Sequence, residues 1–354
     1  MVELLHVRLP FVRPFVTGRG SITTKDVLLV RVRTGDGLEG WGECAAEAAP
    51  TYAAEFLDAA WLALRDHLVP LARRGAPLDV FRGNSMAKAA LEMAVLDAAG
   101  KREGRSLAAM LGGTPGAAIE VGVVVEMHAE VAVVAERAAE HAGQGYRRVK
   151  VKVAPGHDHT IVEAVRAAVG PDVAVWADAN GSYSPGDAPT VAALAVDLLE
   201  QPFAAGDLVD HAHFVASNTG RHLSLDESIG SFHDARAAIA LQAANSLVVK
   251  PGRLGGIRAA VAVHDACRAA GMGAWCGGML ETGIGRAANL ALASLPGFTL
   301  PGDLSASSRY FARDLTEPFV LGPGGTLIVP DGAGLGVAVD VAHVRSCLVR
   351  AEVV

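Results

Sequence analysis

Residues 147–153 read Arg-Arg-Val-Lys-Val-Lys-Val, a short run in which basic side chains alternate with valines. This alternation is typical of a β-strand, because successive side chains of a strand point to opposite faces. Lys150 and Lys152 are therefore expected on one face, with the valines on the other. Ala-rich, helix-like segments stand on both sides of the run, at 129–143 and 159–169. A strand between two helices is the repeating unit of a parallel α/β fold.

The same rhythm continues on both sides of this strand. Short apolar runs alternate with helical segments from about residue 115 to residue 314. The predicted strands are Ile119–Val125, Arg148–Val153, Val173–Asp178, Leu198–Glu200, Leu223–Asp226, Leu247–Lys250, Gly273–Cys276 and Phe298–Leu300. About eight βα units are the number that closes a parallel barrel.

The first 114 residues have a different pattern. Three apolar runs separated by turns, within 4–9, 26–33 and 38–44, predict an antiparallel meander. Helical segments follow, and Ser85–Lys101 is expected to be a buried helix without chemistry. From about residue 315 the chain is Gly-rich, with a short predicted strand at Thr326–Val329, and this tail is expected to pack back on the first domain. The predicted boundaries are thus 1–114, 115–314 and 315–354.

Composition excludes several classes of function. The chain has 354 residues, with 31 Lys and Arg against 38 Asp and Glu, a net charge of −7. This balance argues against a nucleic-acid binder. No apolar run is long enough to span a membrane, and the four cysteines form no CxxC pair. We therefore expect a cytoplasmic protein with reduced thiols, and the high apolar content favours a homo-oligomer.

Five ionisable residues end five consecutive predicted strands. They are Lys152, Asp178, Glu200, Asp226 and Lys250, spaced 22 to 26 residues apart. The carboxyl ends of barrel strands converge on one mouth, where active sites lie. Each residue alone has an ordinary explanation, such as a helix cap or a solvent-facing loop. The order of lysine, three acids and lysine is hard to reach by chance.

These residue types suit one chemistry. Lys150 and Lys152 on one face repel each other, which is expected to lower a lysine pKa toward the range that a general base needs. Three carboxylates at one mouth repel each other as well, and a hard divalent cation such as Mg²⁺ relieves this. A metal between two lysines can stabilise an enediolate formed by removing a proton next to a carboxylate. The expected substrate is a small-molecule carboxylate.

Five motifs stand at these strand ends, and through them the chain resembles the muconate-lactonising-enzyme subgroup of the enolase superfamily. The motifs are Lys150-Val-Lys152, Asp178-Ala-Asn180, Glu200-Gln-Pro202, Asp226-Glu-Ser228 and Lys250-Pro-Gly-Arg253. The resemblance implies an α/β fold, a modified TIM (β/α)-barrel with an N-terminal α+β capping domain.

Four further stretches resemble the o-succinylbenzoate synthase / N-succinylamino acid (N-acylamino acid) racemase family. They are Gly40-Trp-Gly-Glu-Cys44, Met86-Ala-Lys-Ala-Ala-Leu-Glu-Met93, Gly277-Gly-Met-Leu-Glu-Thr-Gly-Ile-Gly-Arg286 and Leu300-Pro-Gly-Asp-Leu-Ser-Ala-Ser-Ser-Arg309. The resemblance implies o-succinylbenzoate synthesis in menaquinone biosynthesis, racemisation of N-acylamino acids, or both.

Residue roles follow from the resemblance. It implies that Lys152 removes the α-proton, that Lys150 neutralises the substrate carboxylate and that Lys250 stands on the opposite face. It further implies an Mg²⁺ site, with Mn²⁺ as a substitute, made by Asp178, Glu200 and Asp226, and supporting roles for Asn180 and Glu227. The substrate-contacting candidates are Arg253, Gly278 and Met279, with Phe15 and Arg19 in a lid loop at 13–21. A second loop, 49–52, is a further lid candidate.

Arg253 bears on which reaction is available. It follows Lys250 by three residues, and a nearby guanidinium is expected to lower the pKa of Lys250. Racemisation needs Lys250 to give and take a proton, whereas dehydration needs it only to stay charged. Racemase activity is therefore expected to be chemically available. An ordinary surface arginine paired with a helix carboxylate is the alternative.

Other readings remain open at the level of sequence. A dipeptide epimerase is expected to carry an Asp-x-Asp pair near the last strand, where this chain has Asp303-Leu-Ser305. A muconate-type cycloisomerase would keep the same lysines and acids. Sugar-acid dehydratases usually place a histidine on these strands, and none of the 12 histidines falls there. A non-catalytic protein of the same fold would be expected to have lost one of the five residues.

Overall fold

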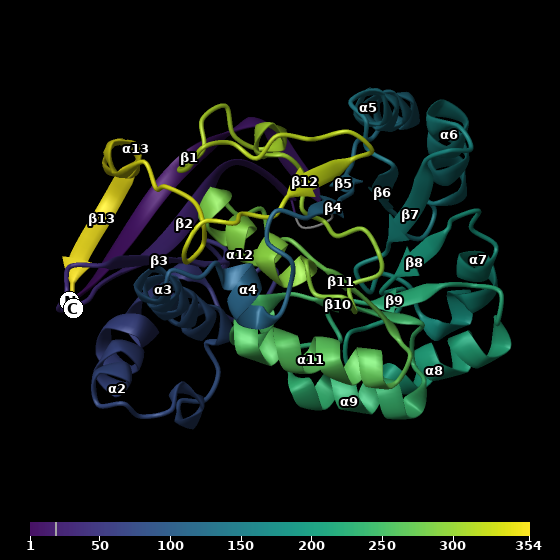
Figure 1. Ribbon diagram of the computed structural model, residues 1–354. Helices are drawn as coiled ribbons and strands as arrows, with labels where there is room; N and C mark the ends of the chain where they lie inside the picture. The colour runs from purple at the N-terminus through teal and green to yellow at the C-terminus, as the bar shows by residue number, and fades with distance from the viewer. Residues whose placement is uncertain (18–19) are drawn as a thin grey trace.

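The computed structural model describes residues 1–17 and 20–354, and it contains two main sheets side by side (Figure 1). One is a four-stranded antiparallel sheet in the order β13-β1-β2-β3, and the other is a seven-stranded parallel sheet in the order β11-β10-β9-β8-β7-β6-β5. In this described part of the chain, no helix is long and apolar enough to cross a membrane.

The antiparallel sheet belongs to the capping region. Its strands are β1 (Val2–Thr17), β2 (Gly20–Arg33), β3 (Glu39–Cys44) and β13 (Leu348–Val353). The predicted meander is confirmed, and the end of the chain adds β13 beside β1, so that the amide of Val354 bonds the carbonyl of Val2 (Figure 1). Strand alternation gives the sheet two apolar faces. Val27 and Leu29 face the barrel core, and Leu28 and Val30 face the helices of the cap.

Helices cover the other face of this sheet. They are α1 (Leu57–Ala63), α2 (Val69–Arg73) and α3 (Ser85–Glu103), whereas the following helix α4 (Leu107–Leu111) packs against α12 on the side of the barrel. The helix predicted at Ser85–Lys101 is confirmed as the buried α3. It packs directly on β3 because Gly40 and Gly42 present no side chain to it. A β-carbon at Gly42 would come 1.9 Å from the carbonyl oxygen of Ala90.

The parallel sheet curls into most of a barrel, with helices on its outside (Figure 1). Its strands are β5 (Val123–Val124), β6 (Arg148–Lys152), β7 (Ala174–Asp178), β8 (Leu198–Glu200), β9 (Leu223–Leu225), β10 (Ser246–Val249) and β11 (Gly273–Cys276). The helices are α5 (Val131–Gly143), α6 (His159–Val169), α7 (Ala188–Ala192), α8 (Leu208–Ser217), α9 (Phe232–Leu241), α10 (Pro251–Leu254), α11 (Ile257–Ala269) and α12 (Gly283–Ala293). Near the C-terminus stands α13 (Val341–Ser346). A modified (β/α) barrel with a cap is thus the fold.

The strand predicted at Ile119–Val125 is wrong as a single element. It divides into β4 (Ala118–Glu120), which pairs with β12 (Thr326–Ile328), and β5, which begins the parallel sheet. The division falls near Gly122, whose missing side chain leaves room for Arg148. The backbone of Gly122 bonds the carbonyl of Gly302. The chain therefore leaves one sheet and enters the other at this point.

The eighth strand predicted at Phe298–Leu300 is reduced to a single parallel bridge between Phe298 and Ala274 of β11, and the residues after it are irregular. Pro301 lacks the amide that a ladder requires, and it is followed by Gly302. The segment nevertheless closes the barrel. The amide of Asp303 bonds the carbonyl of Cys276 at the end of β11, and the carbonyl of Gly302 accepts from Gly122 beside β5. Asp303 is thereby fixed at the mouth of the barrel.

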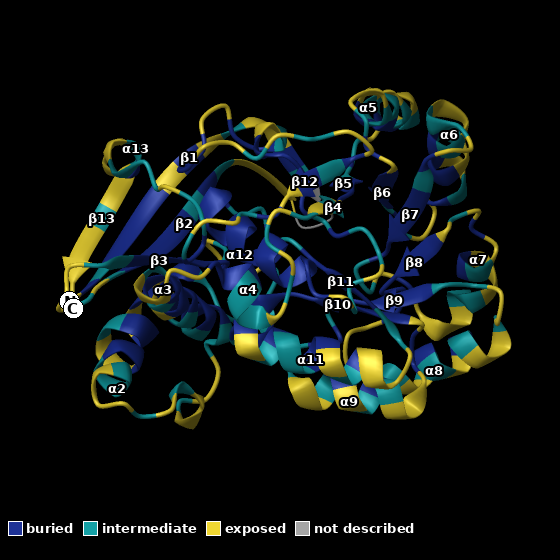
Figure 2. Ribbon diagram, in the orientation of Figure 1, coloured by how far each residue is buried: buried dark blue, intermediate teal, exposed yellow. Residues whose placement is uncertain are grey.

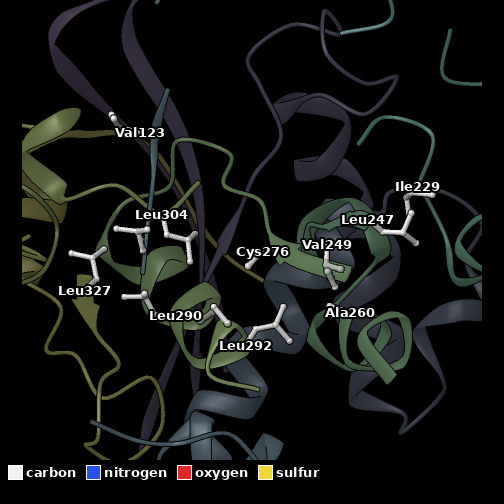
Figure 3. Close-up of a cluster of buried hydrophobic side chains, with 14 of the residues drawn as sticks. Val123, Ile229, Leu247, Val249, Ala260, Cys276, Leu290, Leu292, Leu304 and Leu327 are labelled. Carbon is white, nitrogen blue, oxygen red and sulfur yellow. The ribbon is translucent and has the colours of Figure 1, made fainter. Parts of the chain in front are cut away.

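The core lies between the parallel strands and their helices. The strands are buried, whereas the outer faces of α8, α9 and α11 are exposed (Figure 2). Figure 3 shows part of this core, with Val249 and Cys276 from the sheet and Leu290 and Leu292 from α12 among its labelled side chains. This packed interior leaves the ends of the strands as the place for a cavity.

Candidate active site

A cavity of about 280 Å³ lies between the carboxyl ends of the barrel strands and the cap. Eight of the predicted site residues on the barrel line it: Lys150, Lys152, Asp178, Asn180, Asp226, Lys250, Gly278 and Met279. The cap contributes Phe15, residues 20–26 of β2 except position 23, and the loop that includes Tyr52. A larger groove of about 1130 Å³ lies beside α5 and the 306–321 segment, but it contains none of these residues.

Strand β6 supplies the two lysines of the motif. Val149, Val151 and Val153 are buried in the core, and Arg148, Lys150 and Lys152 lie on the opposite face, as the alternation predicts. Strand register then aligns the charged ends, because Lys152 is the register partner of Asp178, and Asp178 is the partner of Glu200. Charged residues that are about one βα unit apart in the sequence therefore lie side by side at the ends of neighbouring strands.

Lysine ammonium groups lie directly on the predicted metal ligands. Nζ of Lys152 is 2.6 Å from Oδ2 of Asp178 and donates to Oδ1 of Asn180 at 2.8 Å. Nζ of Lys150 lies 2.7 Å from Oε2 of Glu200 and 3.4 Å from Asp178. Asn180 in turn donates to Oε1 of Glu227 at 2.8 Å. Asn180 thus orients Lys152, and its backbone amide also donates to Oδ1 of Asp178, a predicted metal ligand, at 3.0 Å.

The second catalytic candidate, Lys250, is separated from Lys152 by three strands of the sheet. Lys250 directly follows β10, and β7, β8 and β9 separate that strand from β6. Its Nζ donates to Oδ2 of Asp226 at 2.7 Å and to the hydroxyl of Tyr52 at 3.1 Å. Lys152 and Lys250 therefore flank the acids that end the three strands between them.

Arg253 lies behind Asp226 and does not line the cavity. Its guanidinium donates to Oδ1 of Asp226 at 2.6 Å, to the hydroxyl of Tyr52 at 2.7 Å and to the carbonyl of Ile229. Tyr52, from the cap, thus contacts both Lys250 and Arg253. The sequence identified the loop of Tyr52 as a lid candidate. The contact between Tyr52 and Arg253 could be recognised only in the folded structure.

Two further residues of the site, Arg148 and Asp303, were missed by the sequence analysis. Oδ1 of Asp303 accepts from Arg148 at 2.5 Å, and Oδ2 accepts from Lys150 at 2.5 Å. The Arg148 guanidinium is buried over the ring of Trp176, 4.3 Å from its centroid. The period-two alternation places Arg148 on the same face of β6 as Lys150. The sequence pattern could therefore have identified Arg148 as a residue of the site.

Burial and paired charges shift the pKa values of the acids in opposite directions. Burial acts to raise the pKa of Asp178, but the ammonium groups of Lys152 and Lys150 outweigh it and lower that pKa. Burial and the charge of Asp178 hold the pKa of Glu200 well above its usual range. For Asp226, Arg253 and Lys250 overcome burial and lower the pKa. Glu200 is thus the acid least compensated by positive charge.

The expectation that repulsion between lysines lowers their pKa is wrong for Lys150. Burial acts to lower its pKa, but the charges of Asp303, Glu200 and Asp178 raise it well above the ordinary value. Lys250 behaves in the same way. Burial and Arg253 lower its pKa, and Asp226 outweighs them so that the pKa stands above its usual range.

The donor set fits a hard divalent cation by its chemistry. Within residues 1–17 and 20–354, no three acidic, histidine or cysteine side chains stand ready as a metal-ligand set, because lysines lie on the carboxylates instead. Oε1 of Glu200 is nevertheless buried, and no described residue donates to it. Three carboxylates on neighbouring strands form the all-oxygen environment that Mg²⁺ prefers.

The predicted substrate-contacting residues fall into three groups. Phe15, Gly278 and Met279 line the cavity. Arg253 lies behind it in contact with Asp226, and so does Glu227, for which a supporting role was predicted and which contacts Asn180. Arg19 lies outside the described residues.

Comparison with known proteins finds matches to members of the enolase superfamily along most of the chain. Residues 1–112 match the mandelate racemase / muconate lactonizing enzyme N-terminal domain, and residues 133–343 match the enolase C-terminal domain-like family. The chain is 46% identical to an N-succinylamino acid racemase from Amycolatopsis over 349 residues, which cover 95% of this chain and 94% of that protein. It is 43% identical to an o-succinylbenzoate synthase from Geobacillus stearothermophilus over 351 residues, 96% and 93% of the two chains.

Solved structures agree with this comparison. A probable mandelate racemase from Alicyclobacillus acidocaldarius matches with a TM-score of 0.90 and 40% identity, over 99% of this chain and 97% of that chain. The N-succinyl Arg/Lys racemase from Bacillus cereus matches with a TM-score of 0.90 and 26% identity, over 100% and 98%. With its capped barrel and its lysine–acid–lysine series, the chain belongs to the mandelate racemase / muconate lactonizing enzyme family of the enolase superfamily, among relatives named o-succinylbenzoate synthase and N-succinylamino acid racemase.

Proposed function

We propose that this protein is an Mg²⁺-dependent o-succinylbenzoate synthase of menaquinone biosynthesis, whose site also racemises N-succinylamino and other N-acylamino acids. The observation that carries the proposal is the placement of Lys152 and Lys250, which line one cavity from opposite sides of three acid-bearing strands. Relatives of both names, at 38–46% identity, support the two activities.

Asp178, Glu200 and Asp226 would hold the Mg²⁺, for which Mn²⁺ is a substitute. When bound, the cation supplies positive charge that stabilises the negative charge developing on the substrate carboxylate. Lys150 adds an ammonium group for the same carboxylate. Its position is fixed by Asp303 and Glu200, at 2.5 Å and 2.7 Å.

In the dehydration, Lys152 acts first as base and then as acid. Its amine takes the α-proton, and the electron pair left on the α-carbon forms the new double bond as the hydroxyl leaves the neighbouring carbon. Lys152 returns the proton to that hydroxyl, and water departs. Asn180 and Asp178 hold the Lys152 Nζ in place for both transfers. Lys250 only needs to remain charged at the opposite face.

In the racemisation, Lys152 and Lys250 exchange roles according to the enantiomer. One lysine takes the α-proton from its own face, and the other delivers a proton to the opposite face. The racemase role is favoured by Arg253, which shares Asp226 with Lys250 and so draws that carboxylate partly away from the ammonium group.

The test is a paired assay on one preparation with Mg²⁺. One arm measures dehydration of the succinyl-cyclohexadiene carboxylate to o-succinylbenzoate. The other measures α-proton exchange in D₂O and loss of optical rotation for an N-succinylamino acid. Both activities are expected to disappear with a chelator and to return with Mg²⁺. Lack of activity in both arms, with Mg²⁺ bound, would contradict the proposal.

Two variants separate the roles of the lysines. Lys152→Ala is expected to abolish dehydration. Lys250→Ala is expected to abolish racemisation while Lys152 still exchanges the α-proton of one enantiomer. Retained racemisation in Lys250→Ala would overturn its assignment. Lys88→Ala, which changes a lysine on α3 that does not line the cavity, is the control.

The cellular setting is proposed on more general grounds. All four cysteines are free, which agrees with a reducing cytoplasm. A homo-oligomer remains our expectation, and analytical ultracentrifugation of the purified protein tests it.

A further inference from the structure

Lys25 is a buried lysine in the wall of the cavity, on the side of the cap. It lies on β2 and shares the barrel-facing side of that strand with Val27 and Leu29. The residue is only 4% exposed, yet it lines the cavity. Its Nζ donates to the backbone carbonyl of Met279 at 3.2 Å. This bond uses one of the three donors of the ammonium group.

Lys25 differs from the other lysines of the cavity in lacking an acidic partner. Lys150, Lys152 and Lys250 each have a carboxylate oxygen within 2.7 Å. Among residues 1–17 and 20–354, no carboxylate oxygen lies within 4.0 Å of the Lys25 ammonium group.

Two charged neighbours of Lys25 on β2, unlike Lys25 itself, are paired with groups of opposite charge. Arg31 is buried on the same face of the strand, and its guanidinium is paired with Glu3 and Glu39. Asp26, the adjacent acid, is held instead by His6 and Arg8. A buried ammonium group without a counter-charge is costly. Although Asp26 and Glu47 also line the cavity, the Lys25 ammonium group is therefore left without a carboxylate in direct contact among the described residues.

The location of Lys25 relates it to the reacting end of the cavity. Its acceptor, Met279, stands two residues after Gly277, or at most about 7 Å of extended backbone. A β-carbon on Gly277 would come 2.6 Å from Cε of Lys250. The Lys25 ammonium group is thus separated from the catalytic lysine by one short loop, while the predicted metal ligands stand on other strands.

We infer that Lys25 determines substrate specificity by binding a second carboxylate, the one that ends the acyl chain of the substrate. The inference rests on the proposed function, in which the first carboxylate lies at the Mg²⁺ site. A neutral acyl end would leave the buried ammonium group uncompensated, whereas a carboxylate supplies the missing charge. Lys25 is then the residue that distinguishes a succinyl chain from an acyl chain of similar length that ends in a methyl group.

The test compares two substrates in three proteins. The substrates are N-succinyl-L-phenylalanine and N-butyryl-L-phenylalanine, and the proteins are the wild type, Lys25→Met and Lys25→Arg. Lys25→Met is expected to lower kcat/KM for the succinyl compound by roughly tenfold to a hundredfold, the range for losing a charged hydrogen bond. The butyryl compound is expected to change by less than about threefold, within the range of a neutral contact. Lys25→Arg keeps the charge and is expected to keep most of the preference for succinyl.

Outcomes other than this selective loss overturn the inference. An equal loss with both substrates would mean that Lys25 only positions the backbone of Met279, and an unchanged preference would mean that it does not contact the acyl end. If Lys25→Met does not fold, Lys25→Gln provides the comparison, because it removes the charge but keeps a hydrogen-bond donor for the carbonyl of Met279.

Binding of both compounds, measured by calorimetry with Mg²⁺, separates this inference from the proposed function. A succinyl preference that disappears in Lys25→Met supports the role of Lys25 even when neither compound undergoes α-proton exchange, which would count against the proposed function alone. Absence of the preference in wild-type binding would overturn the role of Lys25.

Discussion

Arg253 and Lys250 bind opposite oxygens of one carboxylate, with Nη1 of Arg253 2.6 Å from Oδ1 of Asp226 and Nζ of Lys250 2.7 Å from Oδ2. Asp226 is buried between them. The guanidinium therefore competes with the ammonium group for the same negative charge. Arg253 does not itself line the cavity, so a change at Arg253 reaches Lys250 through Asp226.

Replacement of Arg253 by Gln is expected to impair racemisation more than dehydration. Without the guanidinium, Asp226 pairs more fully with Lys250, and the charge of Arg253 no longer acts to lower the Lys250 pKa. We expect racemisation to fall by roughly tenfold to a hundredfold, the range for losing a hydrogen bond to a charged group. Both rates are measured on one preparation, with Arg253→Lys as the charge-retaining control. Equal losses in both reactions would contradict this role.

Asp303 is expected to be important for stability as well as for the position of Lys150. It compensates the buried guanidinium of Arg148, whose other acceptor is the carbonyl of Pro301. Asp303→Ala leaves a buried charge without its acid, which typically costs about 3–5 kcal/mol. The free energy of unfolding in urea measures the loss. Asp36→Ala, which breaks an exposed pair with Arg102, serves as the control and is expected to leave the free energy of unfolding nearly unchanged. Similar losses in the two variants would refute the assignment.

Local patterns were sufficient for the parts of the fold that depend on local sequence. The alternation in residues 148–153 predicted which side chains of β6 face the cavity, and the composition of Ser85–Lys101 predicted α3. That helix ends at Glu103 because Gly104 adopts a left-handed conformation at φ 64°. The five ionisable strand ends also followed from spacing, since each βα unit brings the chain back to the same mouth.

Contacts between distant segments could not be read from the sequence in this way. Arg148 meets Asp303 across 155 residues, and Lys25 meets Met279 across 254. The first contact depends on how the barrel closes, and that closure replaces a predicted strand by an irregular segment containing Pro301. The second depends on how the cap docks on the barrel. Neither docking nor closure leaves a periodic signal in the sequence.

Gly42 is expected to be intolerant of a side chain. A β-carbon there would overlap the backbone of α3, 1.9 Å from the carbonyl oxygen of Ala90, so that strand and helix would have to separate. Overpacking of this kind costs about 1–3 kcal/mol or more. Gly42→Ala is expected to lower the urea midpoint accordingly. Gly35→Ala, at a position with open space around it, is the control and is expected to leave the midpoint nearly unchanged.

Glu43 is expected to make stability depend on pH. It lies on β3 of the cap, and its carboxylate accepts from the amide and hydroxyl of Thr282 and from the amide of Gly285, at the start of α12 in the barrel. Burial, with the nearby charge of Glu281, raises its pKa to about 7 from the usual 4.5. Between these two values the folded protein holds a proton that the unfolded chain releases.

The sign of the effect follows from this difference. The contribution of Glu43 to stability is complete below about pH 4.5 and is lost as the pH rises to about 7, a change of about 3 kcal/mol at most. Glu43→Gln cannot titrate, so its free energy of unfolding is expected to fall less steeply over this range than that of the wild type. Urea unfolding of both proteins between pH 4.5 and pH 8 measures the difference in slope. Parallel curves would show that the cap–barrel contact at Thr282 holds Glu43 ionised throughout.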